Sequence, residues 1–337
     1  MRRVLAVLTV GLTGAVVTAQ AAAQQGAATA APPAPPAAIT WAYPLNPPAP
    51  AAPAGAAPAA APAPAPDPTQ LSLPGATAKF TRAQIGAQQP ADWRPETHPA
   101  MPDIVANGRT DVRACALCHY PNGQGRPENG PVAGLPAQYI IQQLVDFQSG
   151  ARKSSEPRMG PPAAMVRLAK AMTPEEMAAS ADYFASFSYK PWVQVKEATT
   201  VPKLKIVGGM FMPAEGTEAI GNRVVEVPEF PERTELRDPI AGFIAYVPPG
   251  TLAKGEAIAN GGAGRAACAA CHGPDLRGLG PVPPIAGRTV SYLTRQLYDF
   301  KSGARAGAWA ALMMPIVHGL SEADMMAVAA YAASMKP

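Results

Sequence analysis

Two short stretches of the chain carry residues whose types and spacing could do chemistry. Residues 115–119 read Cys-Ala-Leu-Cys-His, and residues 268–272 read Cys-Ala-Ala-Cys-His. The C-x-x-C-H order is the attachment signature of a c-type haem: two thiols add across the porphyrin vinyl groups, and the histidine binds the iron. A zinc site would need a fourth ligand that neither stretch supplies. The sequence therefore predicts two haem c groups, attached through Cys115, Cys118, Cys268 and Cys271 and bound by His119 and His272.

The two pentapeptides belong to an internal repeat. Their first cysteines lie 153 residues apart. The same offset carries residues 143–152 onto residues 296–305, and eight of these ten positions are identical. The sequence therefore contains two copies of one domain, as a duplication would produce.

Each copy shows the pattern of about three helices around its pentapeptide. A first short helix precedes the cysteines and is clearest at 252–260. Apolar residues spaced i, i+4 and i+7 predict a second helix over 139–149 in the first copy and 292–302 in the second. A third helix is predicted to begin at a capping box, at 173–176 in the first copy and 321–324 in the second. The expected fold class is therefore mainly α.

The sixth ligand of each iron decides what the haem can do. A methionine keeps the iron six-coordinate and suits electron transfer, whereas an open position permits oxygen or peroxide chemistry. Aligning the two third helices places Met165 on Met313, each seven residues before the apolar residue that precedes the cap. Both are expected in a loop that returns over the ring, and they are the predicted axial methionines. Met159 and Met314 are the alternatives.

Other residues of the repeat could act beside the haem. A proline precedes a Val/Ile-Ala-Gly sequence in each copy: Pro131 in the first, and Pro284 with Pro283 before it in the second. A carbonyl there could accept the ring N–H of the ligand histidine and so tune the iron, and a simple turn explains these prolines equally well. Residues that could reach a haem propionate, or serve only in packing, are Tyr139, Tyr292, Arg152 and Arg305.

The start of the chain has the order of a secretory signal peptide. Arg2 and Arg3 precede an apolar run over 4–18, and small residues follow. This order predicts a leader over 1–23 and export to the periplasm, with membrane tethering if the leader stays uncleaved. Residues 24–70 are alanine and proline with almost no charge, which predicts a disordered tether. No later stretch is apolar enough to predict a transmembrane span in the mature chain.

The remaining boundaries follow from composition. Residues 71–99 predict an ordered arm on the first domain, and residues 100–189 and 250–337 are the two haem domains. Between them, 190–249 changes to alternating β-branched residues with prolines, which predicts an extended bridge or a small hairpin. The formal charge of +4 falls to +2 without the two leader arginines, which is too weak to indicate a nucleic acid or an anionic membrane as partner.

These motifs together resemble those of a known family. The order of the motifs is similar to that of class I cytochrome c. It runs C-x-x-C-H, then Ala-Gly, then Tyr-x-x-x-Gln-Leu-x-x-Phe-x-Ser-Gly-Ala-Arg, then methionine, then Leu-Ser-x-x-Asp-Met-x-x-x-Ala-Ala-Tyr. Doubled, the pattern resembles the diheme periplasmic cytochromes of the cytochrome c4 kind. Residues 254–335 match better than residues 105–187, which carry an insertion and have Met172 in the leucine position. The resemblance covers about half of the chain and implies His119/Met165 and His272/Met313 coordination.

Three functions fit these predictions. The first is a carrier of single electrons, not an enzyme, between redox partner proteins such as a respiratory complex, an oxidase or a dehydrogenase. The second is a diheme peroxidase, which needs an acid–base group beside an open haem; His98 or His318 would be recruited. The near-identical copies argue against it, because a peroxidase needs two unlike haems. The third is the cytochrome subunit of a periplasmic dehydrogenase.

Overall fold

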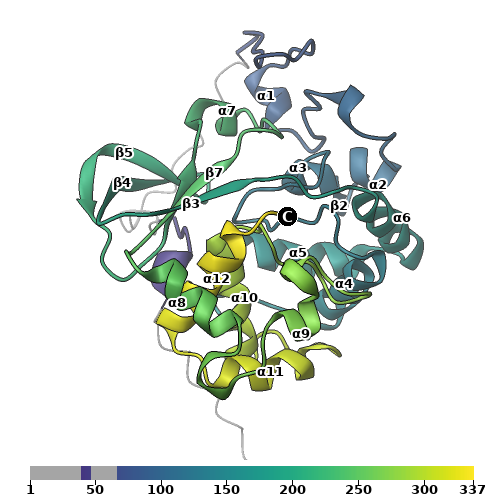
Figure 1. The fold of residues 1–337 in the computed structure, drawn as a ribbon. Coiled ribbons are helices and arrows are strands. Elements are labelled where there is room, and N and C mark those ends of the chain that lie inside the picture. The colour runs from purple at the N-terminus through teal and green to yellow at the C-terminus, as the bar shows by residue number, and fades with distance from the viewer. Residues whose placement is uncertain (1–38, 47–66) are drawn as a thin grey trace, which may run out of the picture. The chain divides into compact units, whose positions relative to one another are not determined.

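The computed structural model describes residues 39–46 and 67–337. The leader predicted over 1–23 lies outside the described residues, as does most of the tether predicted over 24–70. Figure 1 shows the helices of the two haem domains, with the strands β3 to β7 gathered in the segment between them. No helix in the described part of the chain has the length and apolar character to cross a bilayer.

The first haem domain packs its helices around Val105, Leu144 and Phe184. The last of these helices begins where the sequence predicts it, because the Thr173 hydroxyl accepts from the Glu176 amide while the Glu176 carboxylate accepts from the Thr173 amide. The elements of this domain are α2 (Asp103–Ala106), β1 (Gly108–Arg109), β2 (Val112–Arg113), α3 (Cys115–His119), α4 (Ala137–Ser149), α5 (Gly160–Ala171) and α6 (Pro174–Ala185).

The second haem domain repeats this arrangement. Its last helix again begins at a capping box, formed by Ser321 and Asp324. Its first helix comes close to its last at Gly255, where an added Cβ would collide with the backbone of Ala327. The helices are α8 (Thr251–Ala259), α9 (Ala269–His272), α10 (Val290–Lys301), α11 (Ala310–His318) and α12 (Glu322–Ser334).

Each copy therefore has more helices than the three predicted, and the difference concerns the methionines. Met165 lies in α5 and Met313 lies in α11, so the prediction that both stand in loops was wrong. Pro161 and Pro162 do not break α5 because they occupy its first turn, where a missing backbone N–H breaks no helical hydrogen bond. Pro315 stands inside α11.

The segment between the domains forms two small sheets. In one, β3 (Val193–Glu197) pairs in parallel with β7 (Phe243–Val247), which pairs antiparallel with β6 (Val225–Pro228). In the other, β4 (Thr200–Val207) and β5 (Met210–Ala219) form a hairpin. A short helix, α7 (Pro231–Glu235), separates β6 from β7. The predicted hairpin is present. The parallel pairing of β3 with β7 was not predicted from the sequence.

The segments before the first domain are partly structured. In the arm, α1 (Arg82–Ile85) precedes the buried Trp93, whose indole N–H donates to the Leu236 carbonyl at 2.7 Å. The arm thus contacts the inter-domain segment as well as the first domain, where Gln88 donates to the Arg109 carbonyl. Within the predicted tether, residues 39–46 include a short 3-10 turn and the buried Tyr43. The expectation that the whole tether lacks a core does not hold for these residues.

Candidate haem sites

Both predicted ligand histidines have the same local geometry. His119 ends α3, and its Nδ1 donates to the carbonyl of Gly130 at 3.0 Å. His272 ends α9, and its Nδ1 donates to the carbonyl of Pro283 at 2.8 Å. The acceptors are eleven residues after the histidine in both copies. A carbonyl beside the named prolines therefore accepts in both copies: that of Gly130, directly before Pro131, in the first, and that of Pro283 in the second.

This hydrogen bond prepares each imidazole to bind a metal. With Nδ1–H fixed on a carbonyl, Nε2 carries a free lone pair and the ring orientation is set. Burial lowers the pKa of His119 and of His272, so both rings are neutral near pH 7, the form that a metal requires. Burial raises the pKa of the Cys115 thiol to about 12 and also raises that of Cys268, so these positions favour an uncharged sulfur.

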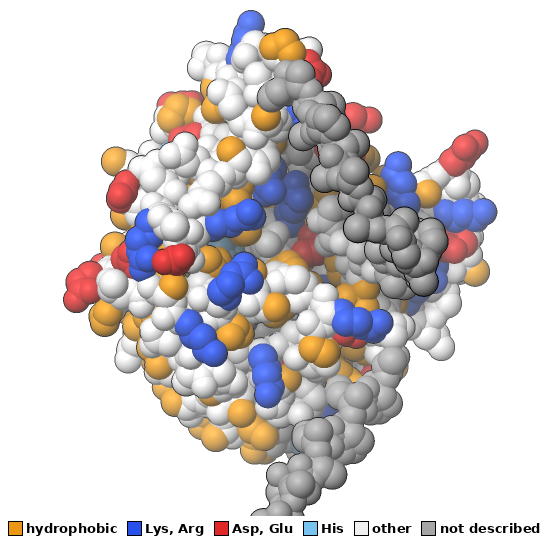
Figure 2. Space-filling model, turned by 180° about the vertical axis from the view of Figure 1, so that it is seen from behind, with side chains coloured by type: hydrophobic (Ala, Val, Ile, Leu, Met, Phe, Trp, Pro, Cys, Tyr) orange, Lys and Arg blue, Asp and Glu red, His pale blue; other side chains and the backbone are white. Residues whose placement is uncertain are grey.

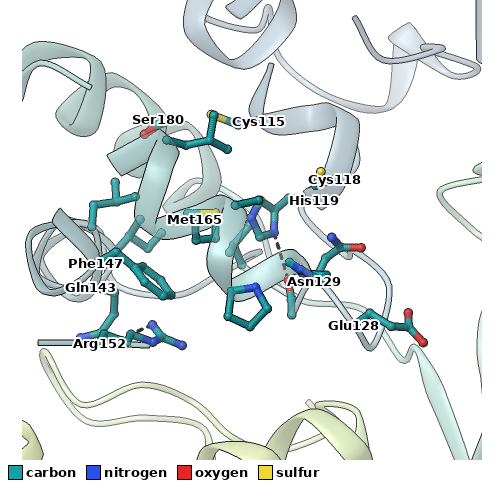
Figure 3. A pocket seen from close by; sticks show the side chains of 18 of the residues that line it. Cys115, Cys118, His119, Glu128, Asn129, Gln143, Phe147, Arg152, Met165 and Ser180 are labelled. Carbon is teal, nitrogen blue, oxygen red and sulfur yellow. Dashed lines mark hydrogen bonds between the residues drawn. The ribbon is translucent and has the colours of Figure 1, made fainter. Parts of the chain in front are cut away.

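The first domain has a cavity at this place. It is lined by Cys115, Cys118 and His119 on one side and by apolar side chains of α4 and α5, including Phe147 and Met165, on the other. Figure 3 shows the His119 ring and the Met165 thioether both reaching into this cavity, with the two cysteines nearby. Two thiols, an imidazole and a thioether around one apolar cavity are the side chains that haem c uses.

The four candidate methionines differ in their surroundings. Met165 packs against the core of the first domain together with Cys115. Met159 also lines the cavity, but it is 3% exposed and packs against Tyr43 and neighbouring residues of the N-terminal segment. In the second domain Met313 packs against the core together with Cys268, whereas Met314 is 39% exposed.

The two copies meet at a cluster of polar side chains. Arg152 and Arg305 are paired across an isolated β-bridge, with the Lys153 amide donating to the Ala304 carbonyl at 2.9 Å and the Ala306 amide to the Ala151 carbonyl at 2.7 Å. Each arginine also reaches the opposite domain through its side chain. Arg152 donates to Tyr292 at 3.3 Å and to Gln296 at 2.8 Å, and Arg305 donates to Tyr139 at 2.6 Å and to Gln143 at 2.8 Å.

These two arginines are buried beside uncharged partners. Within 39–46 and 67–337, neither forms an ion pair with a carboxylate. Asp299 lies near enough to Arg152 for the two charges to interact, but the two side chains do not form an ion pair. A buried guanidinium without a paired counter-charge is costly. Arg152 lines the haem cavity of the first domain, so the carboxylates of a haem would supply that charge. The predicted set of Tyr139, Tyr292, Arg152 and Arg305 is thus brought together at the junction of the domains.

The residues considered for a peroxidase do not gather at a haem site. His98 is held by Asp92 at 3.1 Å and by the Pro99 carbonyl at 2.9 Å, outside the residues that line the cavity. His318 ends α11 and is exposed. Neither histidine lines the cavity that contains His119 and Met165.

The fold and the paired histidine sites define a c-type cytochrome with two tandem domains. The family model for cytochrome c matches residues 105–188 and 252–336, about half of the chain. The chain belongs to the cytochrome c family. It holds two covalent haem c groups, and its function is electron transfer.

Known relatives with two such domains resemble most of the chain. It is 31% identical to a thiosulfate dehydrogenase electron acceptor of Stutzerimonas stutzeri over 66% of this chain and 79% of that protein. It is 24% identical to cytochrome c4 of Pseudomonas aeruginosa over 67% of this chain and 86% of that protein. Among solved structures, thiosulfate dehydrogenase TsdBA of Marichromatium purpuratum is similar at 25% identity and a TM-score of 0.46, over 69% of this chain and 39% of that one.

Proposed function

We propose that this cytochrome carries single electrons between periplasmic redox proteins and does not itself transform a substrate. The residues that would hold the two irons are His119 with Met165 in the first domain and His272 with Met313 in the second. The observation that carries this proposal is the identical proximal geometry of the two copies. A peroxidase needs two unlike haems, and here both histidines are fixed by a backbone carbonyl in the same way.

The side chains around each haem site would then hold the haem in a fixed geometry. When bound, haem c supplies the one-electron couple of its iron. The hydrogen bond on Nδ1 keeps each imidazole oriented, and the methionine thioether would occupy the remaining ligand position and so exclude small molecules. Met165 stands in a helix packed on the domain core, which limits its movement between the oxidation states. Little reorganisation on electron transfer is the property that a carrier needs.

The junction of the domains supports exchange between the two haems. Arg152 and Arg305 lie side by side there, each bonded to a tyrosine of the opposite copy. We assign them to the haem propionates, because their hydrogen-bond partners among the described residues are uncharged. Their crossed hydrogen bonds would hold the two domains, and therefore the two haems, in one arrangement.

A periplasmic dehydrogenase is the electron donor that we favour. The basis is the similarity to the Stutzerimonas stutzeri protein, whose name describes it as the electron acceptor of thiosulfate dehydrogenase. A second candidate follows from the same similarity: the chain could serve as a cytochrome subunit that stays bound to such an enzyme. Size measurement of the native complex separates the two, because a subunit co-purifies with the dehydrogenase and a carrier does not.

Replacement of the proposed methionines tests the axial assignment. In the purified diheme protein, Met165→Ala and Met313→Ala should each open one iron, so that carbon monoxide binds about one haem per chain. Met314→Ala is the matched control, since its side chain is 39% exposed, and it should bind no more carbon monoxide than the unchanged protein. Carbon monoxide binding by Met314→Ala but not by Met313→Ala would transfer the role to Met314.

A further inference from the structure

Residues 39–46, the purple segment of Figure 1, lie outside both cytochrome c matches but contact both haem domains. We call these residues the strap. Trp41 packs against the core that the second domain shares with the inter-domain strands. The Ala42 carbonyl accepts from the buried Arg295 guanidinium of the second domain at 2.7 Å. These contacts fix one side of the strap on the second domain.

The strap contacts the first domain through Tyr43. The Tyr43 ring packs against Met159, which is 3% exposed, and the Tyr43 hydroxyl is 2.8 Å from the Ser155 hydroxyl. Because Ser155 donates its own proton to the Asp299 carboxylate at 2.8 Å, Tyr43 is the donor of this bond. Burial raises the pKa of Tyr43, so its hydroxyl keeps the proton that it donates. Tyr43 therefore joins the strap to the residues that precede α5.

The residues that Tyr43 contacts belong to the insertion-bearing stretch of the first copy. Arg152 and Met165 are 13 residues apart, whereas the equivalent Arg305 and Met313 are only 8 apart. Both contacts of the strap tyrosine stand within the longer stretch. The strap and the insertion, which are two features that the repeat does not contain, thus pack against each other.

The start of α5 depends on this packing. Its N-cap residue is Met159, and no side-chain hydrogen bond caps the helix there, in contrast to the capping boxes of α6 and α12. The first turn of a helix without a cap is the part that most easily unwinds. Met165 lies six residues further on, fewer than two helical turns away. A loosened start of α5 would therefore also free the Met165 thioether to move.

The end of the strap stands at an opening of the haem cavity. Residues 44–46 line a depression that shares Cys118 and Met159 with the cavity of the first domain. Figure 2 shows that the face opposite to that of Figure 1 is hollowed between Lys and Arg side chains, in agreement with the arginines that line the depression. Release of the strap would thus loosen α5 and also remove one wall of the opening.

We propose that the strap fixes the start of α5 and so keeps Met165 in place at the first haem site, and that its release opens this site alone. The proposal rests on the methionine ligation proposed above. The stretch before Met313 lacks the insertion that the strap contacts, so the second site should be unaffected. With the strap docked, both sites serve only electron transfer. With the strap released, the first site also admits a small ligand.

Imidazole titration of the full, oxidised diheme protein tests the strap. Imidazole competes with a methionine for the iron, so its apparent affinity measures how firmly each thioether is held. The strap-release variant is Ile39→Ser with Tyr43→Ser, because both side chains are buried in the docked strap. It should bind imidazole about tenfold more tightly at one haem and within about twofold of the unchanged protein at the other. The matched control is Thr40→Ser with Asn46→Ser, which changes two exposed strap residues and should leave both affinities unchanged.

A pair of smaller changes separates positioning from a general loss of stability. Tyr43→Phe keeps the ring and removes the hydroxyl, so it also decides the question where the strap-release variant does not fold. It should raise the imidazole affinity of the same haem by about threefold. In a Ser155→Ala background, where the acceptor is already missing, Tyr43→Phe should add nothing, because both changes break one hydrogen bond. A general loss of stability would instead add in the double variant.

Met165→Ala identifies the affected haem. Strap release combined with Met165→Ala should give no further gain in imidazole affinity at that haem, because its thioether is already absent. An unchanged affinity in the strap-release variant, equal gains at both haems, or a further gain in the Met165→Ala background would overturn the proposal. Failure of the proposed function would show separately, because Met165→Ala alone would then leave imidazole binding unchanged.

Discussion

Arg288 connects the two histidine sites, and its replacement should change both. The residue is 2% exposed, and its guanidinium donates from Nε to the Pro284 carbonyl at 3.0 Å. From the other two nitrogens it donates to Pro131 at 3.0 Å and to Ala133 at 2.9 Å. Pro131 and Pro284 directly follow the residues whose carbonyls accept from His119 and His272. One side chain of the second domain thus fixes both acceptor loops.

Arg288→Met keeps much of the side-chain length and removes every donor. Three carbonyls lose a charged donor, and the gain from no longer burying a charge offsets part of that loss. We expect the free energy of unfolding to fall by about 2–4 kcal/mol. For a chain of this size that lowers the melting temperature by roughly 3–6 °C. The looser acceptor loops should also weaken the two Nδ1 hydrogen bonds.

Weaker hydrogen bonds make both imidazoles poorer electron donors, and this disfavours the oxidised iron. A loss of about 0.5–1 kcal/mol in each bond corresponds to a rise of roughly 20–40 mV in each one-electron potential. Spectroelectrochemical titration of both haems measures the rise. Arg277→Met is the control, because Arg277 is exposed and its hydrogen bonds, both to the Lys336 carbonyl, are 3.3 Å long. Reduced stability with either potential unchanged would refute the idea that Arg288 acts on both sites.

Two further substitutions test the packing and the caps of the second domain. Gly255→Ala should destabilise by about 2 kcal/mol in chemical denaturation despite the better helix propensity of alanine, because its Cβ would collide with the Ala327 backbone. Gly160→Ala is the control, because an added Cβ at Gly160 meets no atom within 4 Å, and it should leave the free energy of unfolding unchanged. Equal losses of stability in the two variants would count against this explanation. Partial burial alone would raise the pKa of Asp324. Hydrogen bonds, including one from Lys254, instead lower this pKa to about 2. Because the pKa in the folded state lies below the ordinary 3.8, the ionised Asp324 stabilises the folded state at neutral pH. This stabilisation is lost as the pH falls from 3.8 through about 2. Asp324→Asn should therefore show a smaller drop in melting temperature between pH 4 and pH 2, and an unchanged drop would contradict the assignment.

Local patterns explain what the sequence predicts well. The starts of α6 and α12 follow from Thr173 and Ser321 because a capping box involves only four neighbouring residues. The pentapeptides predict the haem attachment for the same reason, since spacing alone sets the fit to the porphyrin. The repeat then transfers each assignment from one copy to the other.

Interactions between distant residues explain what the sequence does not predict. The helices α5 and α11 carry prolines that resemble loop signals, and packing on the domain core makes them helical. The pairing of β3 with β7 joins Val193 to Phe243, across fifty residues without a repeat to guide the alignment. Arg288 has no counterpart in the first copy, where Leu135 stands at the same offset. No local signal reveals that it spans both domains.

The central claim is that each iron is bound by one imidazole and one thioether. Near-infrared magnetic circular dichroism of the oxidised, full-length protein tests it most directly, because the charge-transfer band reports the axial pair of every low-spin haem. The account predicts a single histidine–methionine band whose intensity corresponds to two haems per chain. A high-spin signal, or a histidine–histidine band from either haem, would contradict it.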